Sequence, residues 1–229
     1  MSLIDTDKQW LLSVNGSESL FLDNLATTLT TATTWIPLYV MLLFLVIRNS
    51  GSAKKVAIIV LCALLCVFLA GSLDDMIVKP LVARWRPARD PDIGISVDIV
   101  DGYRGGRFGF FSAHASNTFS LAVFFMWLVR SRLLSISLAA WSLLNCWTRM
   151  YLGVHYPGDI VVGLLWGAIV GSAVWYLCIR IVPQHIAPSN YVSEKYTSTG
   201  FQRDHIDSLV VVLLLTLCYA IIKSCIVIQ

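Results

Sequence analysis

Long runs of apolar residues, separated by shorter polar segments, dominate this sequence. Hydrophobic residues make up 57% of the 229 residues and charged residues only 14%, whereas an ordinary soluble domain carries roughly 25% charged residues. A membrane-spanning helix needs about 20 consecutive apolar residues, and several runs approach that length. We therefore expect an all-α integral membrane bundle of about six transmembrane helices. The expected spans cover residues 25–47, 56–77, 113–129, 133–150, 158–182 and 208–228.

The overall charge and the cysteines argue against several classes of protein. A formal net charge of +3 is too small to indicate a nucleic-acid-binding surface. All six cysteines lie inside apolar runs, which favours small buried or lipid-facing side chains over a disulfide framework or a metal site. We expect no metal, no other cofactor, no nucleic-acid partner and no obligate protein partner.

The N-terminal segment, residues 1–24, alternates apolar clusters with acidic residues. It has no basic segment leading into an apolar one, which argues against a signal peptide. The pattern leaves two readings open, an interfacial amphipathic helix or a flexible tail.

Basic residues in short loops indicate how the spans are oriented, because such loops are enriched on the cytoplasmic side. The connections between spans one and two, three and four, and five and six carry this signal. Their basic residues are Arg48, Lys54, Lys55, Arg130, Arg132, Arg180, Lys195 and Arg203. Loops 78–112 and 149–157 then lie together on the opposite face. They hold seven more basic residues, an exception that suggests a function for these charges.

Three blocks of polar residues fall at this opposite face. The first runs from Lys79 to Pro87, the second from Phe111 to His114, and the third from Thr148 to Asp159. With the topology given above, all three blocks converge at one end of the bundle.

The blocks offer several groups that bind anions. Lys79 supplies a point charge, and Arg86 and Arg149 supply planar forks, all suited to phosphate oxygens. Ser112 stands where the third span begins, so its hydroxyl and the backbone N–H groups that follow, starting at Ala113, can receive an anion.

Two histidines and a carboxylate complete the set. His155 precedes the expected start of the fifth span at Pro157, where the positive end of a helix favours arriving negative charge. Asp159 can orient one imidazole nitrogen and leave the other free to attack. His114 is a second imidazole, able to protonate a leaving oxygen. Each feature alone is weak, because basic residues near helix ends usually extend to lipid head groups; the combination is what indicates a site.

The order and spacing of these residues resemble the three signature motifs of the type 2 phosphatidic acid phosphatase family, which is related to the vanadium haloperoxidases. Those motifs are K-x6-R-P, P-S-G-H and S-R-x5-H-x3-D. The matching residues are Lys79, Arg86 and Pro87 in the first, Ser112 and His114 in the second, and Arg149, His155 and Asp159 in the third. Phe111 replaces Pro, Ala113 replaces Gly and Thr148 replaces Ser. None of these changes removes a group that the chemistry needs.

The resemblance implies a single membrane phosphatase domain over residues 1–229, with its motif core at 74–182 and its last span at 208–228. It implies that His155 is the nucleophile, that Asp159 orients it, and that His114 is the acid that releases the lipid alcohol. The phosphate-binding residues that it implies are Lys79, Arg86, Ser112, Ala113 and Arg149.

The reaction expected from this resemblance is hydrolysis of a lipid phosphomonoester or diphosphate through a phosphohistidine, without a metal. Undecaprenyl diphosphate, lipid A, phosphatidylglycerol phosphate and phosphatidate all suit a cationic pocket beside the hydrocarbon layer. The compact chain resembles bacterial members of the family. We therefore expect an enzyme of the inner membrane of the cell envelope, with membrane lipids as partners and its active site on the periplasmic face.

Two other functions are left open by the residues. A non-catalytic transporter or channel would line its path with intramembrane charges, but here the charges cluster at one end of the spans. A vanadate-dependent haloperoxidase would bind vanadate in the same pocket, although those relatives are soluble and larger.

Several other residues have two readings. Asp75 either holds the Lys79 ammonium group or is a solvated boundary carboxylate. The glycine-rich run 102–109 either approaches a phosphate by its backbone or forms a flexible loop, and the clustered glycines favour the loop. Gly residues at four-residue steps in the fifth span favour close helix packing; they are Gly163, Gly167 and Gly171. The loop arginines bind a second phosphate or a sugar, or are solvated; they are Arg84, Arg89, Arg104 and Arg107.

Overall fold

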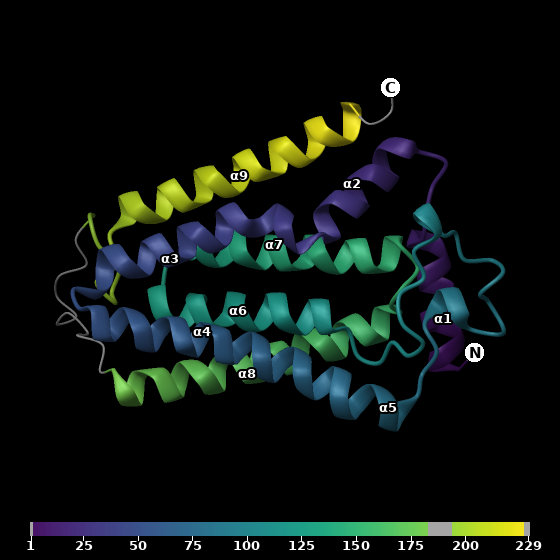
Figure 1. The fold of residues 1–229 in the computed structure, drawn as a ribbon, viewed down its shortest axis with the longest axis horizontal. Coiled ribbons are helices and arrows are strands. Elements are labelled where there is room, and N and C mark those ends of the chain that lie inside the picture. Colours follow the sequence, from purple (N-terminus) through teal and green to yellow (C-terminus); the bar gives the residue numbers. More distant parts are fainter. Residues whose placement is uncertain (1, 183–193, 227–229) are drawn as a thin grey trace.

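The computed structural model describes residues 2–182 and 194–226. Within them, long helices run side by side along one axis and are joined by short connections (Figure 1). These helices are α3 (Ile36–Ser50), α4 (Ala53–Leu73), α6 (Ala113–Val129), α7 (Arg132–Tyr151), α8 (Pro157–Ile181) and α9 (Arg203–Ile226). The all-α membrane bundle predicted from the apolar runs is confirmed.

Helical segments of the described chain differ in how well they suit a membrane. Four are long and apolar enough to cross one: Ala32–Ser50, Ala53–Val82, Pro157–Ile181 and Arg203–Ile226. Helix α6 is apolar but shorter, and most of its side chains are buried at the centre of the bundle. Helix α7 is more polar, because its buried side includes Asn145 and Arg149.

The first expected span, 25–47, is two helices rather than one, so the prediction of a single helix there is wrong. Helix α2 (Leu20–Thr30) is separated from α3 by a 3-10 turn at Ala32–Trp35. Threonine hydroxyls in this region bond nearby carbonyls, which competes with a regular helix. Pro37 then stands in the first turn of α3, where its missing N–H is tolerated. The helix break therefore follows from the threonine-rich start of the run.

The second span extends beyond its predicted end at residue 77. Helix α4 continues through one wider π-helical turn, Asp74–Val78, into the short helix α5 (Lys79–Val82). The helix ends at Ala83, which has a left-handed backbone with φ of 49°. Single π turns are frequent at functional sites, and this one carries the side chains that precede the first sequence block.

Helices α6 and α8 approach each other closely at the centre of the bundle. A Cβ added at Gly163, Gly167 or Gly171 would lie only 2.4 to 2.7 Å from a main-chain oxygen of α6. Only glycine permits this approach. The packing role predicted for the glycine steps is confirmed, and this contact sets the position of the N-terminal end of α6 against that of α8.

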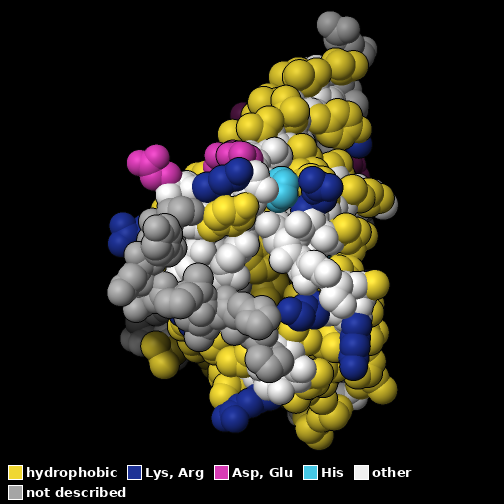
Figure 2. Space-filling model, turned by 90° about the vertical axis from the view of Figure 1, so that its left-hand side faces the viewer, with side chains coloured by type: hydrophobic (Ala, Val, Ile, Leu, Met, Phe, Trp, Pro, Cys, Tyr) yellow, Lys and Arg dark blue, Asp and Glu magenta, His cyan; other side chains and the backbone are white. Residues whose placement is uncertain are grey.

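The two ends of the bundle differ in the segments that cover them. The loops from α5 to α6 and from α7 to α8 lie at one end, where α1 (Leu3–Val14) crosses the bundle (Figure 1). Figure 2 shows Lys and Arg side chains on the opposite end. The second and third sequence blocks, and the loop that follows the first, therefore share the end that α1 covers.

The N-terminal segment forms helix rather than a tail in the described residues. Ser2 begins α1 as its N-cap and accepts a hydrogen bond from the Asp5 N–H at 3.2 Å. Leu11 is fully buried in a small cluster with Tyr156, while Trp10 on another side of the helix remains exposed. Helix α1 is thus amphipathic and docked on the loops of the site end.

Candidate active site

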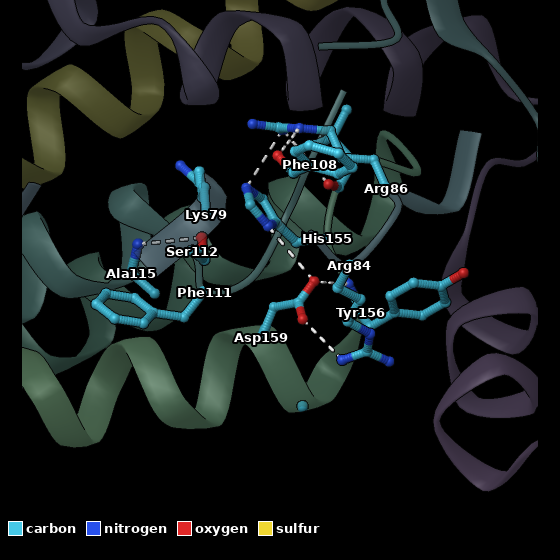
Figure 3. A network of polar contacts seen from close by, with 12 residues as sticks. Lys79, Arg84, Arg86, Phe108, Phe111, Ser112, Ala115, His155, Tyr156 and Asp159 are labelled. Atoms are coloured by element: carbon cyan, nitrogen blue, oxygen red, sulfur yellow. Dashed lines mark hydrogen bonds and ion pairs between the residues drawn. The ribbon is translucent and has the colours of Figure 1, made fainter. Parts of the chain in front are cut away.

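The three sequence blocks meet beneath α1, as predicted (Figure 3). Arg86 Nη1 lies 3.4 Å from His155 Nε2, which joins the first block to the third. The Ser112 N–H donates to the Asp159 carbonyl oxygen at 3.1 Å, which joins the second block to the third. In the view of Figure 3, Lys79 and Ser112 are drawn on the same side of His155. Side chains that are far apart in the sequence therefore share one site.

His155 lies at the centre of this site and is only 1% exposed. It precedes α8, whose first residue is Pro157, as the sequence predicts. Burial, and then the guanidinium groups of Arg86 and Arg149 and the ammonium group of Lys79, hold the pKa of His155 well below its ordinary value. The ring is therefore neutral, and one of its nitrogens keeps a lone pair with which it can attack.

The tautomer of His155 follows from its neighbours. Arg86 carries only hydrogen-bond donors, so Nε2, which faces Arg86, is the nitrogen that accepts. The proton then sits on Nδ1, which faces Asp159 Oδ2 at 3.6 Å. Nδ1 has no hydrogen-bond partner among the described residues, and Oδ2 of Asp159 is the acceptor that it faces. The geometry leaves Nε2 as the nitrogen that carries the free lone pair.

Asp159 is fully buried in the first turn of α8. Its Oδ2 accepts the Tyr156 N–H at 3.0 Å. Its Oδ1 accepts from Arg84 Nη1 at 2.8 Å. The carboxylate is thus held on both oxygens while it faces His155, which is the arrangement predicted for an orienting partner.

Lys79 is paired with two carboxylates. Its Nζ lies 2.5 Å from Asp75 Oδ1, which confirms the first of the two readings of Asp75, and 2.8 Å from Asp74 Oδ2. Asp74 was missed by the sequence reasoning, although it is fully buried and its Oδ1 also accepts the Phe111 N–H at 3.0 Å. Residues five apart do not share a side of an α-helix, but the π turn places Asp74 beside Lys79.

Ser112 caps α6, as the sequence predicts. Its Oγ accepts the Ala115 N–H at 3.4 Å, and its own hydroxyl hydrogen can still be donated. The N–H groups of Ala113 and His114 belong to the first turn of the helix, where no intrahelical acceptor exists. Such a helix start is suited to binding an anion.

Arg149 is buried near the end of α7 and is 2% exposed. Its Nη1 donates to Thr30 Oγ1 at 2.5 Å, and its Nη2 donates to Tyr103 Oη at 3.2 Å. Thr30 and Tyr103 come from distant segments and carry no motif, so sequence reasoning missed both. His114 lines the same cavity as Thr30, so this second histidine also belongs to the site.

The glycine-rich run 102–109 is packed on the Arg86 side chain. Arg86 Nε donates to the Phe108 carbonyl oxygen at 3.0 Å. A Cβ at Gly105 or Gly109 would lie 2.8 or 3.0 Å from atoms of the Arg86 side chain. The glycines allow the loop to surround this guanidinium and set its direction.

The other loop arginines are occupied by protein groups, which neither sequence reading anticipated. Arg84 forms ion pairs with Asp7 at 2.6 Å and with Asp159 at 2.8 Å. The others bond or stack within the loop: Arg89 on the Gly105 carbonyl, Arg104 on the Ala88 carbonyl, and Arg107 over the rings of Trp85 and Phe108. Arg84 is therefore part of the site, because it binds Asp159, the residue that faces His155.

A cavity of about 760 Å³ leads from the site into the bundle. Thr30, His114 and Asn117 line its polar end. The rest is lined mostly by apolar side chains of α3, α4, α6 and α7, with Thr118 and Asn145 among them. Along α6 the cavity extends from His114 to Phe125, which is ~16 Å at 1.5 Å per residue. That depth is about half of the ~30 Å hydrocarbon core of a bilayer. Leu64, on the cavity wall, is 61% exposed.

Comparison with known proteins gives a family and several relatives. The PAP2 superfamily matches residues 55–182. A lipid A 4'-phosphatase of Bacteroides thetaiotaomicron is 38% identical over 180 residues, covering 78% of this chain and 80% of that protein. A lipid A 4'-phosphatase of Porphyromonas gingivalis is 32% identical over 180 residues, covering 78% and 76%.

A more partial match adds a third relative. The decaprenylphosphoryl-5-phosphoribose phosphatase of Mycobacterium tuberculosis is 36% identical over 99 residues, which cover 43% of this chain and 50% of that protein. No solved structure matches the chain significantly. The family match includes all three sequence blocks and the helices from α4 to α8 that position them. The chain therefore belongs to the PAP2 superfamily, as its three motifs predict.

Proposed function

We propose that this membrane lipid phosphatase removes a phosphate from a lipid A-type phosphomonoester by transferring it to His155. One observation carries the proposal. The buried, neutral His155 has Arg86 at 3.4 Å from Nε2 and Asp159 at 3.6 Å from Nδ1. One nitrogen is thereby directed at the cationic end of the site, and the other is directed at a carboxylate that can stabilise the charge that develops on the ring.

The first chemical step forms a bond between His155 Nε2 and phosphorus and breaks the bond between phosphorus and the lipid oxygen. The electron pair of the broken bond stays on that oxygen, which takes a proton from His114, whose protonated form the negative charge of the bound phosphate favours. Lys79, Arg86 and Arg149 stabilise the charge on the equatorial phosphoryl oxygens, which is the main task in phosphoryl transfer. The helix start at Ser112 and Ala113 adds backbone donors.

The second step hydrolyses the phosphohistidine. Water attacks phosphorus, His114 takes its proton, the phosphorus–nitrogen bond breaks, and inorganic phosphate leaves. The electron pair returns to Nε2, which restores the neutral ring with its proton on Nδ1. His114 thus acts as an acid in the first step and as a base in the second.

The side chains of the site support a reaction without a metal. Cationic groups supply the positive charge that metal ions supply in other phosphatases. Within the described parts of the chain, no group of three His, Cys, Asp or Glu side chains is arranged to hold a metal ion.

The cavity supports a substrate with a long hydrocarbon chain. Its polar end includes His114, the proposed acid, so a chain lying in the cavity would place the lipid oxygen beside this imidazole. The two relatives that span most of this chain are named lipid A 4'-phosphatases. This similarity favours a lipid A-type phosphomonoester over undecaprenyl diphosphate, phosphatidylglycerol phosphate and phosphatidate.

The charge distribution supports an active site on the periplasmic face of the inner membrane. Basic residues at the opposite end (Figure 2) flank short connections, such as Arg130 and Arg132 between α6 and α7. Short loops of this kind stay in the cytoplasm. The basic residues at the site end bind groups of the site and of its loops. These contacts account for basic residues on the proposed periplasmic face.

Phosphate release by the purified protein in detergent, with EDTA present, tests the proposal. The panel is lipid A, undecaprenyl diphosphate, phosphatidylglycerol phosphate and phosphatidate. We expect release by the wild type, fastest from lipid A, and none by a His155→Ala variant that elutes as the folded protein does. Near wild-type release by His155→Ala would overturn the phosphohistidine mechanism, and loss of activity in EDTA that returned with a divalent metal would overturn metal independence.

A further inference from the structure

We propose that Asp7, on the N-terminal helix α1, is a positioning residue of the active site, acting through Arg84 on the Asp159–His155 pair. This inference rests on the proposed function, because it takes Asp159 as the partner of the nucleophile. It assigns a working role to a helix that lies outside the residues matched by the family.

Asp7, Arg84 and Asp159 form a continuous row of charged contacts. Arg84 Nη2 lies 2.6 Å from Asp7 Oδ2, and Arg84 Nη1 lies 2.8 Å from Asp159 Oδ1. The guanidinium also lies over the Tyr156 ring, 4.2 Å from its centre. The other oxygen of Asp159 faces His155 (Figure 3). Only one guanidinium and one carboxylate therefore separate Asp7 from the nucleophile.

The second oxygen of Asp7 is held independently of Arg84. Oδ1 accepts the Gly158 N–H at 2.8 Å in the first turn of α8, where the positive end of the helix favours an anion. A Cβ at Gly158 would lie 2.8 Å from Asp7 Oδ2, so the glycine makes room for the carboxylate. Asp7 is thus fixed to the same helix that carries Asp159.

The geometry explains how Asp7 would position Asp159. A guanidinium is a planar fork that readily binds both oxygens of one carboxylate. Because Asp7 occupies Nη2, Arg84 binds only Oδ1 of Asp159, and Oδ2 is left for the Tyr156 N–H and for His155 Nδ1. Without Asp7, Arg84 is free to turn and bind both oxygens, which draws Oδ2 away from the imidazole.

Helix α1 is docked by contacts that do not involve Asp7. Lys8 Nζ lies 3.3 Å from Asp90 and 2.6 Å from Asp92, and the Asn15 side chain donates to the Tyr151 carbonyl at 2.8 Å. A change at Asp7 therefore removes the link to Arg84 and leaves the helix in place. Lys8, the next residue, offers a matched control because its loss weakens docking without touching Arg84.

Steady-state kinetics of the full chain in detergent tests the inference, with lipid A as substrate. We expect Asp7→Asn to lower kcat about 10-fold with KM changed less than about 2-fold, since the link orients a catalytic group and does not bind substrate. Lys8→Gln is expected to keep both parameters within about 2-fold of the wild type. Asp7→Asn combined with Arg84→Met should be no slower than Arg84→Met alone, because both act through one contact.

Gly158→Ala provides a second variant that keeps the Asp7 carboxylate but displaces it. The added methyl suits a helix, so this protein is expected to fold and to show lowered kcat in the same direction. Thermal unfolding of each variant in detergent gives the fraction folded, and kcat is taken per folded enzyme.

Three results would overturn the inference: wild-type kcat in Asp7→Asn or, where that variant fails to fold, in Gly158→Ala; equal losses in Asp7→Asn and Lys8→Gln; or additive losses in the double variant. His155→Ala separates this inference from the proposed function. An inactive His155→Ala beside a normal Asp7→Asn rejects only the role of Asp7, whereas an active His155→Ala rejects the mechanism on which that role depends.

Discussion

Asp74 and Lys79 are five residues apart, and Asp74 Oδ2 lies 2.8 Å from Lys79 Nζ. The π turn of α4 places them side by side, and the same carboxylate accepts the Phe111 N–H from the loop before α6. One buried side chain therefore holds both the Lys79 ammonium group, the proposed phosphate ligand, and the main chain that leads to the helix start at Ser112.

Replacing Asp74 by Ala should therefore damage both stability and substrate binding. The change leaves the Phe111 N–H without its acceptor and breaks a buried ion pair, which costs about 3 kcal/mol. We expect a lower Tm in detergent and a raised KM for phosphate release. Asp75→Ala is the control, because Asp75 is 63% exposed and such pairs contribute less than about 1 kcal/mol. Equal effects of the two variants would contradict this assignment.

The lowered pKa of His155 predicts a dependence of stability on pH. Above the ordinary histidine pKa of about 6.5, the ring is neutral in both folded and unfolded protein. Below it, the unfolded protein takes up a proton that the folded protein resists, so the free energy of unfolding falls as pH decreases. We expect Tm to fall less steeply between about pH 7 and about pH 5 in His155→Gln than in the wild type. Parallel curves would show that His155 is not held neutral.

The cavity predicts a variant that distinguishes long-chain from short-chain substrates. Ala63 lines the cavity on α4, whereas Leu61 on the same helix is 64% exposed and does not line it. Ala63→Trp should fill part of the space and reduce kcat/KM for lipid A, with little effect on a short-chain phosphate ester. Leu61→Trp should leave both substrates unaffected. If Ala63→Trp turned over both substrates normally, the hydrocarbon chain would have to lie elsewhere.

The close contact of α6 and α8 predicts a strong effect from one methyl group. A Cβ at Gly167 would lie 2.7 Å from the Ser116 carbonyl oxygen and 3.1 Å from the Ser120 nitrogen. Gly167→Ala should force the helices apart and destabilise the protein by about 1–3 kcal/mol, measured as a lower Tm. Ile169→Ala, at a side chain that is 60% exposed on α8, should change Tm little. A Gly167→Ala variant as stable as the wild type would mean that the helices can separate at low cost.

The parts of the site that the sequence predicts correctly are those set by local chain geometry. His155 and Asp159 are four residues apart, so one turn at the start of a helix brings them together once Pro157 marks that start. Ser112 is recognisable as an N-cap for the same kind of reason. The distance between two residues on one helix, or at one helix end, follows directly from their separation in the sequence.

The parts that sequence reasoning missed depend on contacts between distant segments or on irregular helix geometry. Thr30 reaches Arg149 across 119 positions, and Asp7 reaches Arg84 across 77. Neither threonine nor aspartate at such positions carries a signal of its own. Asp74 was missed because an ordinary helix would direct it away from Lys79, and the π turn cannot be read from residue order.

The main-chain hydrogen bond from the Ser112 N–H to the Asp159 carbonyl has a consequence for how this chain tolerates change. The second and third motifs are joined by a main-chain N–H and a main-chain carbonyl, which every amino acid except proline supplies. Side chains around that bond can therefore be exchanged without releasing the two halves of the site. This accounts for Phe111 and Ala113 standing where the family pattern has Pro and Gly. The side chains at these two positions can be substituted, while the main-chain hydrogen bond between the starts of α6 and α8 is kept.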